Sequence, residues 1–258
     1  MTAFAIVPGR RYAVRQPRGM VRQMEAVSTP AGGKVQLRLI GHHHPAEHDL
    51  GDVLFPWQGF REARRGVPAA SRRLLEAFDN AGLQLFPYGR ESRLVIACTM
   101  TVEQASSLIA AITGDDRLAV AELPVLTAAD IVEGRVYAVR MGNGTIVFRK
   151  VTKVLADKNR VVVDRYHGPA PDGAVPAGYV VCDAETMRDR KRETPIVAAA
   201  LEKTLAEHDV QAQRVIDHHG QAKIHLHLTV QGAHTLSDLL AAEDASDPLA
   251  ELFTADAA

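Results

Sequence analysis

An internal repeat is the feature that most constrains how this chain of 258 residues folds. Residues 7–15 read VPGRRYAVR and return as residues 132–140, VEGRVYAVR, identical at seven of nine positions. Further along, ten residues from Arg22 to Pro68 align without a gap with identical residues from Arg149 to Pro195. Self-similarity at a fixed period indicates a repeated structural unit. We therefore predict two copies of one unit, arranged in tandem.

The first part of each copy consists of short β-type runs separated by Gly/Pro turns. These runs cover residues 12–15, 21–27, 34–40 and 52–55, and in the second copy residues 137–140, 145–154, 160–166 and 179–182. Four short strands at this spacing favour a small barrel of SH3-like or Tudor-like architecture.

The second part of each copy is predicted to be an αββα unit. Leu/Ala periodicity after Pro68 and Pro195 predicts helices at 69–82 and 195–208, each with its proline at the start. Hairpins are expected from 83–88 with 93–99 and from 211–218 with 223–230, and Thr101 is expected to cap a last helix, whose copy covers 235–242. A lone hairpin is marginally stable. The two halves are therefore expected to face each other about a pseudo-twofold axis and close one four-stranded sheet.

The predicted fold class is α+β with a tandem duplication, packed as a pseudo-dimer within one chain. Five segments follow from it. They are barrel 1–68, αββα unit 69–126, barrel 127–195, αββα unit 196–243 and an acidic tail 244–258.

Charge divides along the same boundaries, although the formal net charge is only −1. Residues 1–70 carry 10 Lys+Arg against 5 Asp+Glu, and residues 129–195 carry 12 against 9. Residues 196–258 carry 3 against 10. Basic barrels in a neutral chain are typical of a protein that binds a polyanion, because Arg and Lys contacts to phosphate supply most non-specific affinity. The alternative is an ordinary solvated charged surface.

Arginines that recur between the copies are the candidate binding residues. A planar guanidinium suits phosphate or a guanine edge, whereas in the alternative view the arginine stems pack on the barrels and pair with carboxylates. Aromatic residues are only 5% of the chain, which favours duplex over stacked single strands. The candidates are Arg15, Arg22, Arg38, Arg61, Arg64, Arg65, Arg140, Arg149, Arg165, Arg188, Lys191 and Arg192.

Catalytic motifs are absent from the sequence. It contains no GxxxxGK[ST], GxGxxG, HExxH or GxSxG pattern. Two histidine groups leave metal binding open as an alternative, His42, His43, His44 and His48 in a polar loop, and His218, His225 and His227 on adjacent predicted strands. Their spacing is loose and the copies do not share them. We therefore predict no catalytic residue, no metal and no cofactor.

Several features indicate a cytoplasmic protein. No apolar run approaches the ~20 residues of a membrane-spanning helix, and the first eight residues lack the basic and apolar regions of a signal peptide. Cys98 and Cys182 are expected to be buried and reduced. Residues 237–258 carry six acids and no base, and either dock on a protein partner, pack on their own domain or fray.

Together these patterns predict a non-catalytic accessory or regulatory protein. It is expected to bind nucleic acid, preferably duplex DNA, through basic barrel faces. The alternative is a protein-binding adaptor that modulates a DNA-processing enzyme, such as a recombinase or polymerase, without binding nucleic acid itself. A metal or phosphoester enzyme built on the histidines is the weakest hypothesis. The sequence leaves open the partner's identity, any sequence specificity and the oligomeric state.

Overall fold

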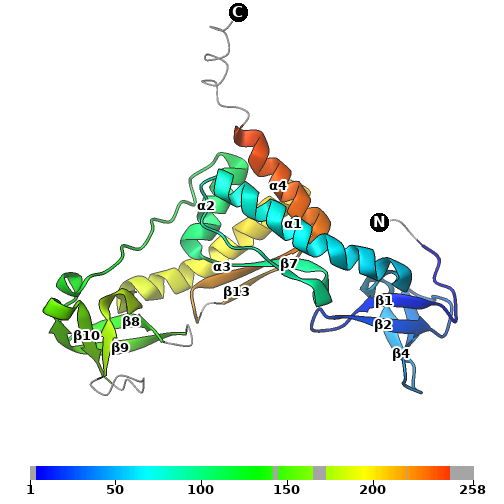
Figure 1. The fold of residues 1–258 in the computed structure, drawn as a ribbon, viewed down its shortest axis with the longest axis horizontal. Helices are drawn as coiled ribbons and strands as arrows, with labels where there is room; N and C mark the ends of the chain where they lie inside the picture. The colour runs from blue at the N-terminus through cyan, green and yellow to red at the C-terminus, as the bar shows by residue number, and fades with distance from the viewer. Residues whose placement is uncertain (1–3, 142–144, 165–172, 219, 245–258) are drawn as a thin grey trace, which may run out of the picture.

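The computed structural model describes residues 4–141, 145–164, 173–218 and 220–244, which form an α+β fold (Figure 1). The first half contains β1 (Arg11–Arg15), β2 (Val21–Ala26), β3 (Lys34–Leu39), β4 (Ala46–Asp49), β5 (Val53–Pro56), α1 (Phe60–Asn80), β6 (Tyr88–Arg90), β7 (Val95–Thr101) and α2 (Val102–Thr113). The second half contains β8 (Val136–Arg140), β9 (Ile146–Leu155), β10 (Arg160–Val163), β11 (Ala174–Pro176), β12 (Val180–Asp183), α3 (Ala184–Glu207), β13 (Ala212–His218), β14 (Lys223–Thr229) and α4 (Val230–Asp244).

Each half begins with a small antiparallel five-stranded sheet. The strand orders, β4-β3-β2-β1-β5 and β11-β10-β9-β8-β12, are the same in the two halves. Sequence analysis found four of the strands in each and missed the short β4 and β11. Within the described residues the edge strands of each sheet do not pair with each other, so the predicted closed barrel is not found.

Helices α1 and α3 begin earlier than predicted. Pro68 and Pro195 lie inside them rather than at their first turns, so the boundaries drawn at residues 68 and 195 fall within helices. Tertiary packing explains the difference, since Phe60 and Ala63 of the extra α1 turns pack on the first small sheet. In α3, Asp183 caps the earlier start by accepting bonds from the backbone of Glu185 and Thr186. Helix α4 is likewise longer than the predicted 235–242.

One four-stranded sheet joins the two halves, as predicted. Its order is β13-β14-β7-β6, with hairpin β6-β7 from the first half and hairpin β13-β14 from the second. Strands β14 and β7 pair antiparallel over seven residues, from Lys223 opposite Thr101 to Thr229 opposite Val95. The hairpin predicted in the second copy is confirmed, whereas in the first copy the predicted strand at 83–88 is wrong and the strand that pairs with β7 is Tyr88–Arg90.

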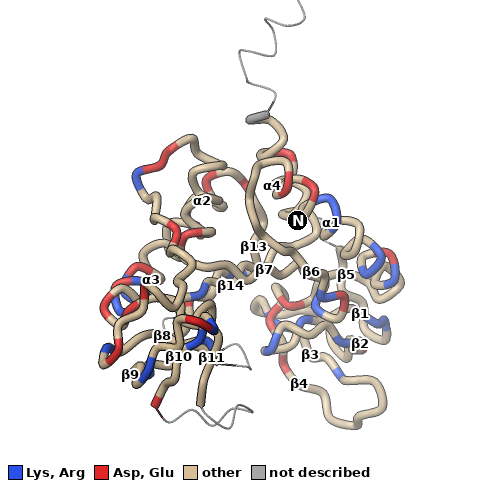
Figure 2. The backbone as a smooth tube through the Cα atoms, turned by 60° about the vertical axis from the view of Figure 1, so that its left-hand side comes forward, with Lys and Arg blue, Asp and Glu red and all other residues tan. Residues whose placement is uncertain are grey.

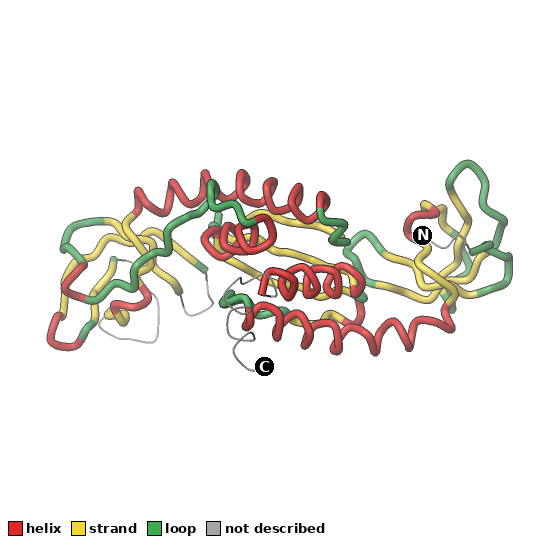
Figure 3. Tube along the Cα trace, turned by 90° about the horizontal axis from the view of Figure 1, so that it is seen from above, coloured by secondary structure: helices red, strands yellow, loops and turns green. Residues whose placement is uncertain are grey.

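The four helices cover one face of this central sheet (Figure 3). The main core lies between them, where Ile96, Cys98, Ile224, Leu226 and Leu228 of the strands meet apolar helix residues. Thr101 caps α2 as predicted, in a capping box with Gln104. None of the helices in the described ranges has the length and apolar character needed to span a bilayer.

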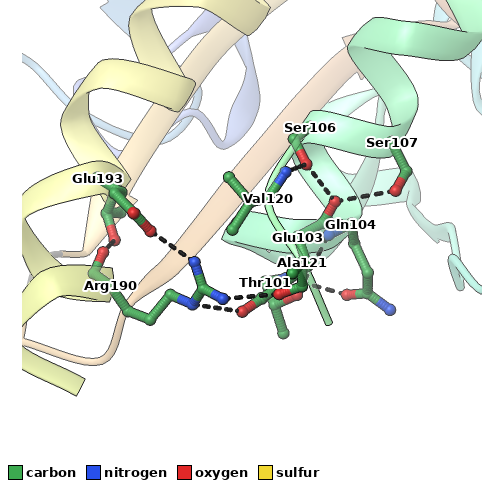
Figure 4. Close-up of polar contacts among 10 residues, drawn as sticks. Thr101, Glu103, Gln104, Ser106, Ser107, Val120, Ala121, Arg190 and Glu193 are labelled. Carbon is green, nitrogen blue, oxygen red and sulfur yellow. Dashed lines mark hydrogen bonds and ion pairs between the residues drawn. The ribbon is translucent and has the colours of Figure 1, made fainter. Parts of the chain in front are cut away.

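A nearly buried ion pair ties α3 to α2 (Figure 4). Arg190 Nε lies 2.8 Å from Glu103 Oε1, and the two side chains are only 13% and 10% exposed. Arg190 also donates to the Ala121 carbonyl at 2.6 Å and to Glu193 at 2.7 Å. The guanidinium therefore holds together two helices and the segment that leads to the second small sheet.

We expect Arg190→Met to lower the free energy of unfolding by about 3–5 kcal/mol, because it leaves the Glu103 carboxylate buried without a counter-charge. The double variant Arg190→Met/Glu103→Leu should recover most of this loss. Chemical denaturation measures both.

The control is Arg192→Met, whose ion pair with Asp189 joins side chains 79% and 57% exposed. Such exposed pairs contribute about 0–1 kcal/mol. Equal losses in the Arg190 and Arg192 variants would contradict a structural role for the buried pair.

Candidate nucleic-acid interface

The central sheet has one face that the helices do not cover. Along β14, Ile224, Leu226 and Leu228 point into the core, so the alternating side chains of His225 and His227 lie on the opposite face. Both histidines are half-buried. We call this side of the sheet the open face.

The register of the sheet identifies its other members, because residues directly opposite on paired strands share a face. His227 lies opposite Arg214 and Ala97, His225 opposite Ile216 and Thr99, and Lys223 opposite His218 and Thr101. The pairs Tyr88 with Ala97 and Arg90 with Val95 add β6 to the same face.

Six side chains of the open face are basic residue types. They are Arg90, Arg214, Lys223, His218, His225 and His227. Asp217 is the only carboxylate in the four strands, and it lies opposite Ile224 on the helix-covered side. The two small sheets project beyond the open face on the side away from the helices, so the face lies in a concavity between them (Figures 1 and 2).

A cleft opens where the first small sheet meets one corner of the open face. Its volume is about 360 Å³. Arg15 ends β1, Arg18 lies in the β1-β2 turn, and Arg93 precedes β7. Arg214 and His227 come from the open face. Asp52 is the one carboxylate in its lining. We call this site the arginine cleft.

The β1-β2 turn is positioned by a glycine at the cleft wall. Gly19 has φ +78°, a left-handed conformation that favours glycine, and a Cβ built there would lie 3.7 Å from Arg93 Cδ. The turn therefore lies against the stem of Arg93. This contact brings arginines from the small sheet and from the central sheet into one site.

Burial and the surrounding basic residues lower the pKa values of two histidines of the open face. Burial lowers the pKa of His225 below its ordinary value, and His218, His227, Lys223 and Arg90 lower it further. The pKa of His227 is lowered by burial and then by Arg90, Arg93 and Arg214. The His225 ring lies 4.5 Å from the His218 ring, and its Nδ1 is 2.9 Å from Thr99 Oγ1.

Only one of the residues predicted from the sequence lies in the arginine cleft, namely Arg15. Arg140 occupies the corresponding strand end in the second half and lines a cavity of about 60 Å³ with Thr101 and Lys223. Arg165 falls outside the described residues.

The other predicted residues lie apart from both sites. Arg22 is exposed on β2, Arg38 pairs with Glu25 at 3.1 Å, and Arg149 donates to the Phe148 carbonyl. Arg61, Arg64 and Arg65 lie in the first turns of α1, where Arg64 pairs with Glu91. Arg188 and Lys191 lie over the Phe148 ring, and Arg192 pairs with Asp189. The structure also brings Arg61, Arg64 and Arg65 together at a separate cavity of about 370 Å³, where Glu91 is the one carboxylate in the lining.

Sequence reasoning missed Arg18, Arg90, Arg93, Arg214 and Lys223. Alternation in the run KIHLHLT at 223–229 did place the two histidines on one face. Extending the same alternation to Lys223 and to Arg214 would have found two of the missed cations. Arg18, Arg90 and Arg93 could be placed near these residues only from the tertiary structure, which brings β6 and β14 into one sheet.

The described residues contain no candidate metal site and no reactive thiol. Among them, no group of three or more His, Cys, Asp or Glu side chains could hold a metal ion. Cys98 and Cys182 are buried as expected, and burial raises their thiol pKa values to about 12 and about 11. Both thiols therefore stay protonated and unreactive near neutral pH.

Comparison with protein-family models, with curated proteins and with solved structures finds no match for this chain. The functional conclusion therefore depends on the site itself.

Lowering the pH should destabilise the fold through His225 and His227. Their folded-state pKa values lie below the ordinary 6.5, so between the two values the unfolded chain binds more protons. The free energy of unfolding should therefore fall as the pH drops through about 6.5. Denaturant titrations at about pH 7.5 and about pH 5.5 measure this effect.

The variant His225→Gln/His227→Gln should show a smaller loss over the same range. The matched control, His42→Gln/His43→Gln, changes two exposed histidines in the turn between β3 and β4 and should behave like the unmodified protein. An unchanged pH dependence in the first variant would contradict this electrostatic account.

Proposed function

We propose that this protein binds nucleic acid, preferably duplex DNA, without catalysing a reaction on it. The observation that carries the proposal is the open face, where three Arg/Lys side chains and three histidines share one side of a sheet without a carboxylate. This modifies the expectation from the sequence, which assigned binding to faces of the two small sheets.

Accumulating like charges on one sheet face has a free-energy cost. Arg90, Arg214 and Lys223 carry the face's charge at neutral pH, and protonation of His227 would place a like charge directly opposite Arg214, which is destabilising. An acidic residue on the face would have relieved the repulsion. A polyanion supplies the missing negative charge, and phosphate contacts from Arg and Lys dominate the affinity of nucleic-acid binders.

The shape and composition of the face favour duplex over single strands. Its only aromatic residue besides the histidines is Tyr88, whose ring and hydroxyl contact Arg90. Readers of single strands generally stack bases on several aromatic rings. A concave basic surface flanked by two small sheets instead suits a phosphate backbone that curves past it.

The alternative is an adaptor that grips a DNA-processing protein. Two exposed apolar side chains favour it, Phe86 at 74% and Val125 at 87% exposure. A partner protein would then cover these side chains, while the cations of the open face would contact acidic groups of that partner.

The origin of the two halves is also a proposal. We propose that the halves arose by tandem duplication, supported by their shared strand order and by equivalent bonds from Val7 to Tyr12 and from Val132 to Tyr137. The SH3-like or Tudor-like character of the small sheets and the cytoplasmic location stay predictions.

The triple variant Arg90→Gln/Arg214→Gln/Lys223→Gln should weaken duplex binding and flatten its salt dependence. Each lost phosphate contact removes about 1 from the slope of log affinity against log salt, so we expect a decrease of about 3. Fluorescence anisotropy of labelled duplex DNA between about 50 and 200 mM salt measures it.

The matched control is Arg61→Gln/Arg64→Gln/Arg65→Gln, which removes three cations from α1. It should keep most of the slope. If the control loses affinity and the open-face variant does not, binding lies on α1 and the assignment to the open face is wrong. If the unmodified protein binds no duplex at low salt, the adaptor alternative gains support.

A further inference from the structure

The arginine cleft brings together four arginines that form no ion pair among the described residues. Arg38, Arg64, Arg73, Arg117, Arg190 and Arg192 each form an ion pair with a carboxylate. Within the described part of the chain, Arg15, Arg18, Arg93 and Arg214 form none within 4.0 Å. Asp52 is the one carboxylate in the lining, so four guanidinium charges meet one negative charge.

A buried donor adds an independent observation. Arg15 Nε is buried and has no hydrogen-bond partner among the described residues. Buried donors in native proteins are nearly always satisfied, and leaving a charged one unpaired is costly. The Nε atoms of Arg149 and Arg160 are also buried without a partner, so what sets Arg15 apart is that its side chain lines a cleft with three other arginines.

The corresponding place in the second half is different. There Arg140 lines two cavities, one of about 330 Å³ that also includes Glu103 and Glu122, and one of about 60 Å³ that it shares with Lys223. Glu103 and Arg190 also line the smaller cavity, and they pair with each other. Neither of these cavities brings together more than two arginines, whereas the arginine cleft, at one end of the open face, brings together four.

We propose that the arginine cleft binds a terminal phosphate, the phosphomonoester at the 5′ end of a nucleic-acid strand or of a free nucleotide. A phosphomonoester carries a charge of about −1.5 to −2 at neutral pH and presents three acceptor oxygens, whereas a backbone phosphodiester carries a single charge. Four guanidinium groups around one cleft match the more highly charged group. Binding of a strand's 5′-phosphate rests on the proposed function, because it requires that the protein binds nucleic acid. Binding of a free nucleotide does not require it.

The test compares two duplexes of the same sequence, one with a 5′-phosphate and one with a 5′-hydroxyl, each carrying its fluorophore at the distal end. We expect the phosphorylated duplex to bind about tenfold more tightly or better, because charge-assisted hydrogen bonds are gained only there. The variants Arg93→Gln and Arg18→Gln should each reduce the preference. Arg18 is exposed, so its replacement should leave folding intact.

Arg72→Gln serves as the control, because Arg72 is exposed on α1 away from the cleft. It should keep the full preference. Labelled AMP, whose 5′-phosphate is a phosphomonoester, is measured in parallel to test the nucleotide source, and binding that is lost in Arg93→Gln supports the cleft as a nucleotide site.

Equal affinity for the two duplexes together with no AMP binding would overturn the inference. If both duplexes still bind, the proposed function survives that result. A 5′-phosphate preference that persists in both cleft variants would also overturn it, because the phosphate would then be recognised elsewhere.

Discussion

The pairing of β7 with β14 is the interaction on which the rest of the structure depends. Seven consecutive residue pairs join strands from the two halves, and Cys98 lies opposite Leu226 at their centre. Each hairpin alone would be a two-stranded ribbon of marginal stability. Joined, they form a sheet wide enough for four helices to pack against one side. The fold of each half therefore depends on the other.

The same register determines the chemistry of the uncovered side. Because strand side chains alternate, the pairing that directs Ile224, Leu226 and Leu228 to the helices directs His225 and His227 to the concavity. A shift by one residue would exchange the two sets. The hydrophobic core and the basic face are therefore consequences of one register, which links fold stability to the proposed binding surface.

Much of this architecture could be predicted from the repeat, and the site largely could not. The repeat of residues 7–15 at 132–140 was sufficient to predict two equivalent halves and their shared sheet. Helix starts were misplaced because Pro68 was interpreted as a first-turn residue, whereas packing against the small sheet extends α1 to Phe60. Arg90 and Arg214 belong to hairpins far apart in the sequence, and only tertiary pairing places them on one face.

Proton NMR of the histidine rings during titration with duplex DNA tests the central claim most directly. The account predicts that the resonances of His218, His225 and His227 shift and that the pKa values of His225 and His227 rise, because bound phosphates stabilise the charged imidazole. His42, His43 and His44, exposed in a distant turn, serve as internal references. Shifts confined to those references, with His225 and His227 unchanged, would contradict binding at the open face.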